Sequence, residues 1–188
     1  MAAGAFVHRF TLSNSDQRTW FRDNLFKFVD GLSPILRRSA STFAQFAAEV
    51  QEELLMNAIW DANPRLRNQD RKVPVTLPPD QAVEVEWCFD GQYLAISVKD
   101  QFGTFEHEIV QTYLKFLFTG DKKTRIQLKR DAAGAGIGLC MVLERLSYLV
   151  INVSPSRLTE VIALIDLSQS PSAVSKNVRS LQYFSVCT

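Results

Sequence analysis

The most restrictive feature of the sequence is a hairpin pattern between residues 83 and 100. Apolar and polar residues alternate over 83–88 and again over 94–100, and an Asp-Gly pair stands between them at positions 90 and 91. Period-two alternation is typical of strands, and Asp-Gly is a favoured dipeptide of tight hairpin turns. The sequence therefore predicts two antiparallel strands in this region.

Helical periodicity precedes the hairpin, and a second hairpin follows it. Apolar residues recur at helical spacing over 20–29 and, for longer, over 43–58. Loose alternation over 6–12 predicts a first strand, and apolar runs at 150–153 and 159–167 predict two late strands. This order favours an α+β fold, a two-layer α/β sandwich with helices packed on one face of a mixed, mainly antiparallel sheet.

Composition indicates one cytoplasmic domain. The 188 residues are 46% hydrophobic, enough for a sizeable core, and a formal charge of +1 gives no reason to expect nucleic acid or an anionic membrane as partner. No apolar run is long enough for a membrane span or a signal peptide. Three dispersed cysteines fit a reducing compartment, so we expect a cytoplasmic protein.

We expect residues 1–188 to form a single domain with its core at 39–167. An N-terminal strand and helix would occupy 6–30, and a serine-rich C-terminal tail would occupy 168–188. Between the two hairpins, 102–133 combines one short helical pattern with a polar, basic run, so we expect a loop there.

Two polar residues on the predicted long helix could carry chemistry. Glu53 and Asn57 are four positions apart, so they share a helix face at the border of the apolar stripe. A carboxylate there could act as a general base, and an amide oxygen could bind Mg2+. An ordinary helix surface is the alternative interpretation of this short pattern.

Two further groups could bind a ligand. Asp100 ends a strand shortly before Gly103, so its carboxylate could accept a hydrogen bond from an exocyclic amino group, or it could simply belong to a turn. Gly134, Gly136 and Gly138 stand directly before a helical pattern, where their backbone N–H groups could hold phosphate. A plain hinge is the alternative, and the spacing matches neither the dinucleotide-binding fingerprint nor the P-loop.

In this order and spacing, the groups resemble the motifs of the Bergerat-fold ATPases. That superfamily comprises gyrase, the heat-shock chaperone and mismatch-repair ATPases, the histidine kinases and the anti-sigma-factor serine kinases. The resemblance covers about 39–167, with 53–58 similar to the N box, 97–103 to the first glycine box and 134–139 to the second. It implies the Bergerat fold and a binding site for ATP and Mg2+.

The resemblance also implies a role for each residue. Glu53 would be the catalytic base, Asn57 the Mg2+ ligand, and Asp100 the adenine ligand, assisted by Thr159. Segment 102–133 would form a lid over the nucleotide. The residues implied to contact phosphates are Gly103, Gly134, Gly136 and Gly138.

Three positions depart from the family pattern. Gly103 stands one residue later than the usual first-box glycine, with Phe102 in its place, and Phe105 stands where a second glycine is frequent. Asp61 stands where a basic or polar residue is common, and its carboxylate could help to hold Mg2+ or could repel phosphates. These departures favour nucleotide binding over catalysis.

Within the superfamily, the length of 188 residues best fits the stand-alone anti-sigma serine-kinase branch. We expect a small bacterial regulator that binds ATP and Mg2+ and phosphorylates or grips a partner, such as a sigma factor, an anti-sigma antagonist or a response-regulator-type protein. No nucleic-acid or membrane partner is expected, and a homodimer is compatible with this role. The alternative is a non-catalytic nucleotide-binding or protein-interaction module with a degenerate ATP site.

Overall fold

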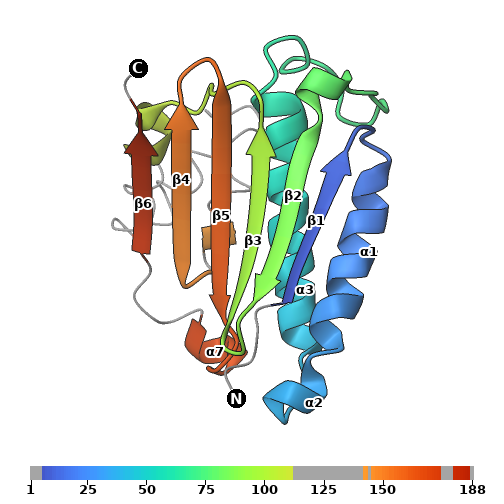
Figure 1. The fold of residues 1–188 in the computed structure, drawn as a ribbon, viewed down its shortest axis with the longest axis vertical. Helices are drawn as coiled ribbons and strands as arrows, with labels where there is room; N and C mark the ends of the chain where they lie inside the picture. The colour runs from blue at the N-terminus through green and yellow to red at the C-terminus, as the bar shows by residue number, and fades with distance from the viewer. Residues whose placement is uncertain (1–5, 112–141, 144, 175–179, 187–188) are drawn as a thin grey trace, which may run out of the picture.

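Two helices pack together with a six-stranded sheet in the computed structural model of the chain (Figure 1). The structure describes residues 6–111, 142–143, 145–174 and 180–186. The sheet is open, mixed and mostly antiparallel, so the chain is an α+β protein as predicted. None of the helices in these ranges is long and apolar enough to cross a membrane.

The first strand, the two long helices and both hairpins predicted from the sequence are confirmed. The elements, in chain order, are β1 (Phe6–Leu12), α1 (Gln17–Asp30), α2 (Ser33–Leu36), α3 (Ser41–Met56), the π-helical turn η1 (Asn57–Asp61), the 3-10 turn η2 (Pro79–Gln81), β2 (Val83–Phe89), β3 (Tyr93–Asp100), β4 (Tyr148–Ser154), β5 (Leu158–Asp166), α7 (Pro171–Val174) and β6 (Ser180–Ser185).

The strand order is β1-β2-β3-β5-β4-β6. Adjacent strands are antiparallel except for β4 and β6, which are parallel. The two hairpins, β2–β3 and β4–β5, therefore meet at the β3–β5 pair in the middle of the sheet. The segment expected to be a C-terminal tail supplies the edge strand β6, in which Leu181 and Tyr183 pack against the core.

One face of the sheet is covered by α1 and α3. In Figure 1, α3 lies behind β2, and α1 lies along the β1 edge of the sheet. Alternate residues of β2 and β3 are buried, as their period-two pattern requires. A buried hydrogen bond crosses this interface, because Trp87 Nε1 donates to Gln51 Oε1 of α3 at 2.5 Å. Both side chains are almost fully buried. This bond fixes the position of α3 relative to β2.

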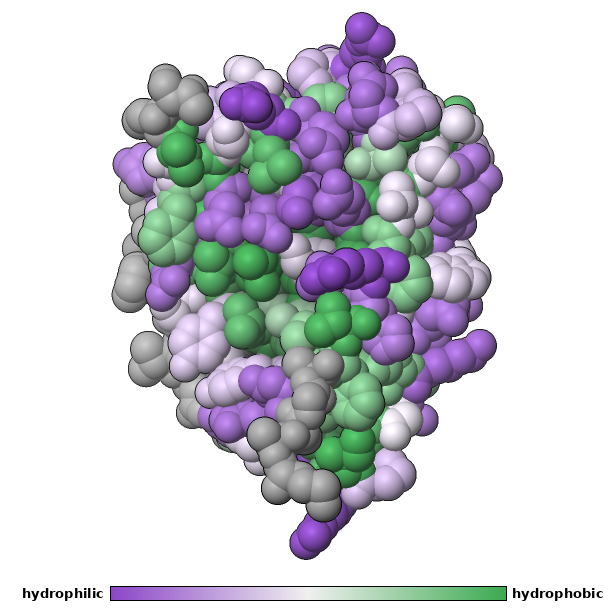
Figure 2. Space-filling model, in the orientation of Figure 1, coloured by the Kyte–Doolittle hydropathy of each residue, from purple (hydrophilic) through white to green (hydrophobic). Residues whose placement is uncertain are grey.

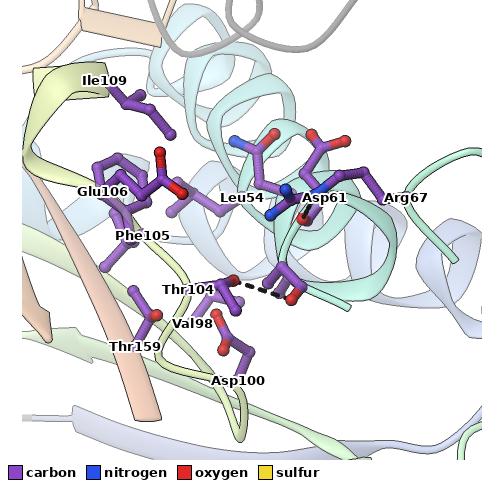
Figure 3. Close-up of a pocket in the computed structure, with 14 residues that line it drawn as sticks. Leu54, Asp61, Arg67, Val98, Asp100, Thr104, Phe105, Glu106, Ile109 and Thr159 are labelled. Carbon is purple, nitrogen blue, oxygen red and sulfur yellow. Dashed lines mark hydrogen bonds between the residues drawn. The ribbon is translucent and has the colours of Figure 1, made fainter. Parts of the chain in front are cut away.

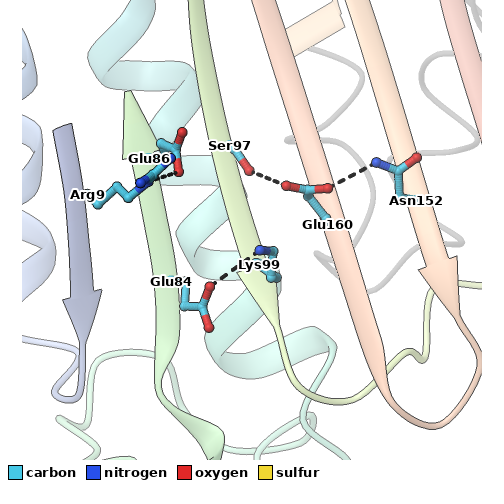
Figure 4. Close-up of polar contacts among 7 residues, drawn as sticks. All are labelled: Arg9, Glu84, Glu86, Ser97, Lys99, Asn152 and Glu160. Carbon is cyan, nitrogen blue, oxygen red and sulfur yellow. Dashed lines mark hydrogen bonds and ion pairs between the residues drawn. The ribbon is translucent and has the colours of Figure 1, made fainter. Parts of the chain in front are cut away.

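The opposite face of the sheet carries polar side chains on neighbouring strands (Figure 4). Arg9 pairs with Glu86 at 2.8 Å, and Glu160 accepts hydrogen bonds from Ser97 and Asn152. Figure 2 shows this face, where hydrophilic and hydrophobic areas lie side by side. The exposed Arg9–Glu86 ion pair adds little stability, but it joins residues that face each other in the β1–β2 register, as the Asn152–Glu160 hydrogen bond does in the β4–β5 register.

We predict that Gln51→Ala lowers the free energy of unfolding by about 2 to 4 kcal/mol, because it leaves the Trp87 N–H unpaired in a buried site and opens a cavity. Urea denaturation measures this loss. Gln45→Ala is the matched control on the exposed side of α3, where the change should stay below about 0.5 kcal/mol. Equal losses in the two variants would show that the buried bond does not hold α3 in place.

Candidate functional site

A cavity of about 270 Å³ lies between η1, the inner face of β3 and β5, and the segment that follows β3 (Figure 3). Its apolar wall is formed by Leu54, Val98, Phe105, Ile109 and Val161. Its polar side chains are Asn57, Asp61, Arg67, Asp100, Thr104, Glu106 and Thr159. Four residues predicted from the sequence, Asn57, Asp61, Asp100 and Thr159, are thus brought together around one cavity.

Asp100 and Thr159 lie at one end of this cavity because β3 and β5 pair in a register that sets them opposite each other. Only 5% of Asp100 is exposed. Its Oδ1 accepts hydrogen bonds from the backbone N–H groups of Phe102, at 2.9 Å, and Gly103, at 3.4 Å. The carboxylate is therefore held by the turn that begins the next segment.

Burial raises the pKa of Asp100 to about 6, from an ordinary value of 3.8. The hydrogen bonds from Phe102 and Gly103 act in the opposite direction, and so does Thr159, but they offset only part of the cost of burial. A carboxylate that is costly to ionise in a cavity is more typical of a functional site than of an ordinary turn.

Thr159 brings a hydroxyl group to the same place. It is 2% exposed, and its Oγ1 makes no hydrogen bond of normal geometry within the part of the chain that the structure describes, although it lies close enough to lower the pKa of Asp100. Buried polar atoms are rarely left without a partner. The hydroxyl and the carboxylate together suit a planar ligand that offers an amino group beside a ring acceptor, as adenine does.

Asn57 and Asp61 reach the cavity because the last turn of the long helix widens into a π-helix. The N–H of Ala62 donates to the Asn57 carbonyl at 2.8 Å, which closes the wide turn. Such turns are frequent at functional sites. The Asn57 side chain makes no hydrogen bond to another described residue, which leaves its amide oxygen accessible to a ligand.

Glu53 lies one turn earlier and faces a neighbouring cleft between α1 and α3, with Glu49, Glu52 and Arg145. The predicted pair is therefore divided between two adjoining hollows, with Asn57 in the cavity and Glu53 beside it. Burial raises the pKa of Glu53, Arg71 lowers it, and the neighbouring carboxylates raise it further.

Asp61 is engaged in an ion pair. Arg71 Nη2 lies 2.5 Å from Asp61 Oδ1, and Arg67 Nε donates to the Asp61 carbonyl at 3.0 Å. Burial raises the pKa of Asp61, and Arg71 partly offsets this. Within the described residues, no three His, Cys, Asp or Glu side chains are clustered so that they could hold a metal ion. A cation here would need oxygens from a ligand as well as from the protein.

Gly103 packs against the β4–β5 turn and does not line the main cavity. Its φ is +62°, and a Cβ at this position would lie 2.1 Å from the Ser154 carbonyl oxygen. Ser156 N donates to the Gly103 carbonyl at 3.2 Å. Backbone conformation and close packing therefore both require glycine at this position. The next residue, Thr104, donates a hydrogen bond from its hydroxyl group to the Ala62 carbonyl at 2.9 Å.

Several predicted residues lie outside the described part of the chain, namely Gly134, Gly136, Gly138 and the lid from position 112 onward. Arg67 lines the cavity although no sequence pattern marked it, and Thr104, Glu106 and Ile109 were expected only as part of the lid segment 102–133. Arg67, Thr104 and Glu106 belong to segments without clear periodicity, and Ile109 belongs to the short helical pattern within 102–133, so no pattern showed which of these side chains face the cavity. Two apolar residues soon after Gly103 in the sequence, Phe105 and Ile109, were the only feature that could have indicated an apolar cavity wall there.

We predict that Asp100→Asn stabilises the protein at pH 8 by about 1 to 3 kcal/mol. The pKa of Asp100 is raised to about 6, so its ionised form destabilises the fold above pH 6, and this cost disappears as the pH falls toward 3.8. Asparagine keeps the acceptor for Phe102 and Gly103 without the charge. Urea denaturation at pH 8 and pH 4.5 measures the difference, which should be much smaller at pH 4.5. A gain that is the same at both values contradicts the prediction.

We predict that Gly103→Ala costs about 2 to 4 kcal/mol of stability, from a disfavoured φ and a clash with the Ser154 backbone. Gly91→Ala is the matched control, because Gly91 also has a positive φ, of +105°, but a Cβ there would meet no atom within 4 Å. Its cost should be about 1 kcal/mol. Thermal and urea unfolding of both variants give the comparison, and a smaller loss at position 103 than at position 91 would exclude the close packing.

No protein-family model matches the chain, and no curated protein shows significant sequence similarity to it.

Proposed function

We propose that this chain is an ATP-binding regulatory domain of the Bergerat type. The observation that carries the proposal is the placement of the buried Asp100 carboxylate beside the buried Thr159 hydroxyl, at one end of a cavity with an apolar wall. The carboxylate can accept a hydrogen bond from the adenine amino group, and the hydroxyl can donate to the neighbouring ring nitrogen. Phe105 and Ile109 offer apolar contact for the ring faces.

The arrangement of the elements supports the same proposal. The two long helices lie on one side of the sheet, which is the two-layer sandwich expected for the Bergerat fold. The predicted N box and first glycine box, which begin far apart in the sequence, meet at the cavity through Asn57 and Asp100. The predicted lid leaves the sheet directly after Asp100, at the cavity edge.

For phosphoryl transfer, the residues at the outer end of the cavity would act on the phosphates and the acceptor. Mg2+, when bound, would neutralise charge on the phosphates, and Asn57 offers it a neutral oxygen. Glu53 lies next to this position, and its burial raises its pKa, which suits a group that must accept a proton from a serine hydroxyl of a partner protein. The proposed partner is a sigma factor, an anti-sigma antagonist or a response-regulator-type protein.

A second candidate is a non-catalytic module in which the nucleotide only sets the conformation and partner affinity of the domain. The observation in its favour is that Glu53 faces the neighbouring cleft, and Asp61 is already paired with Arg71. Binding would then need only the adenine end of the cavity.

We predict that titration calorimetry at pH 7.5 with Mg2+ detects binding of ATP but not of GTP, and that Asp100→Asn lowers ATP affinity at least tenfold. An amide can present an N–H toward the adenine amino group, where the carboxylate offers only acceptors. Asp90→Asn, at the exposed β2–β3 turn, is the control and should leave ATP affinity unchanged. Absence of ATP binding, or an unchanged affinity in Asp100→Asn, would overturn the nucleotide site.

Incubation of the protein with radiolabelled ATP and candidate partners distinguishes the kinase hypothesis from the binding-module hypothesis. Transfer of label that is lost in Glu53→Gln but kept in Glu52→Gln supports the kinase, because Glu52 is one residue away and pairs with Arg18. Tight ATP binding without transfer or hydrolysis supports the module.

A further inference from the structure

The segment that follows η1 places two arginines around Asp61, and one of them, Arg67, lines the cavity. Arg71 pairs with Asp61 at 2.5 Å, and Arg67 lines the cavity while its Nε bonds the Asp61 carbonyl at 3.0 Å. Asp61 and Asn57 belong to the same π-helical turn. The two guanidinium groups are therefore attached to the part of the helix that carries the proposed Mg2+ ligand.

Without these cations, the outer end of the site would be unfavourable for phosphates. Glu53, Asp61 and Glu106 all lie in or beside the cavity, and each repels an anion when ionised. Asp61 and Arg71 are partly buried, so solvent screens these charges less than it screens fully exposed ones. A nucleotide whose phosphates extend past Asn57 therefore needs positive charge at this position.

We propose that Arg71 is a phosphate-binding residue of this site and that Asp61 is the positioning residue that holds its guanidinium at the cavity edge. The inference rests on the proposed function and extends it, because it names the group that recognises the phosphates. It also gives Asp61 a role: the carboxylate orients Arg71, and it is not a free ligand for Mg2+.

The hydrogen-bond geometry of Arg71 leaves donors with which it could bind a phosphate. Its Nη2 is the atom that bonds Asp61, while its Nε and Nη1 make no hydrogen bond within the described ranges. A guanidinium with two remaining donors can bind a phosphate while it keeps its carboxylate partner, because its donors form a planar fork. Arg71 also lies close enough to Glu53 to lower the pKa of that group, so its charge acts on both carboxylates.

We predict that Arg71→Met weakens ATP binding at least tenfold and leaves adenosine affinity within twofold, in titrations with Mg2+ at pH 7.5. Adenosine reports on the adenine end alone, so a merely structural loss would weaken both ligands together. Lys72→Met is the matched control, since it removes an exposed cation from the next position and should change neither affinity more than twofold. Arg71→Lys keeps the charge without the fork and should give an intermediate loss of ATP affinity.

Asp61→Asn tests the positioning role. It should weaken ATP binding less than Arg71→Met, and the double variant should bind ATP no more weakly than Arg71→Met alone, because Asp61 acts through Arg71. Thermal unfolding of each variant identifies loss of fold, and if Arg71→Met is unfolded, Arg71→Lys and Asp61→Asn carry the test.

The outcomes separate the two proposals. Wild-type protein that binds ATP more tightly than adenosine, with that preference reduced in Arg71→Met, supports both. An ATP-to-adenosine affinity ratio that is unchanged in Arg71→Met, or that is already one in the wild type, overturns the role of Arg71 and leaves the nucleotide site in place. Wild-type protein that binds neither ligand overturns the proposed function, and the role of Arg71 with it.

Discussion

The pairing of β3 with β5 is the constraint on which the rest of the structure depends. It joins two hairpins that are far apart in the sequence, and its register runs from Tyr93 opposite Asp166 to Asp100 opposite Thr159. A slip by one residue would turn every inward side chain to the other face, so the buried alternation of both strands fixes this register. The same pairing sets Asp100 and Thr159, two buried polar residues of the site, side by side, so this part of the site depends on the pairing of the two hairpins.

The site is held at a cost to stability, and this cost is concentrated where the strands end. Asp100 is kept in a position where its charge is disfavoured, and Gly103 needs a positive φ to pass the β4–β5 turn. The surrounding core supplies the compensation, because both strands are flanked by buried apolar residues and α3 is bonded to β2 through Gln51 and Trp87.

The sequence predicts the frame of this molecule well because periodicity is a local property. The alternation over 83–100, the late apolar runs and the helical spacing over 43–58 each appear in the structure as elements of the expected type. Asp100 and Thr159 could be predicted as neighbours only with the help of motif order, since pairing between β3 and β5 is not local. The contacts of Gly103, the ion pair of Asp61 with Arg71, and the placement of Glu53 in a separate cleft could not be predicted, because they depend on irregular segments and on the π-helical turn. Strand β6 was missed because its apolar group is short and follows a serine-rich stretch.

On the proposed assignment, Arg71 affects both nucleotide binding and the basicity of Glu53. Burial raises the pKa of both Glu53 and Asp61, and the positive charge of Arg71 partly offsets this for each carboxylate. On the proposed assignment, a bound triphosphate would share this guanidinium and would add negative charge beside Glu53, and both effects raise the pKa of Glu53. A carboxylate with a higher pKa is a stronger base, so Glu53 would become more effective only after the nucleotide is in place. If Arg71 both binds the phosphates and lowers the pKa of Glu53, proton abstraction by Glu53 would be coupled to nucleotide binding. Without a partner hydroxyl within reach of Glu53, the same domain would bind ATP and transfer no phosphate.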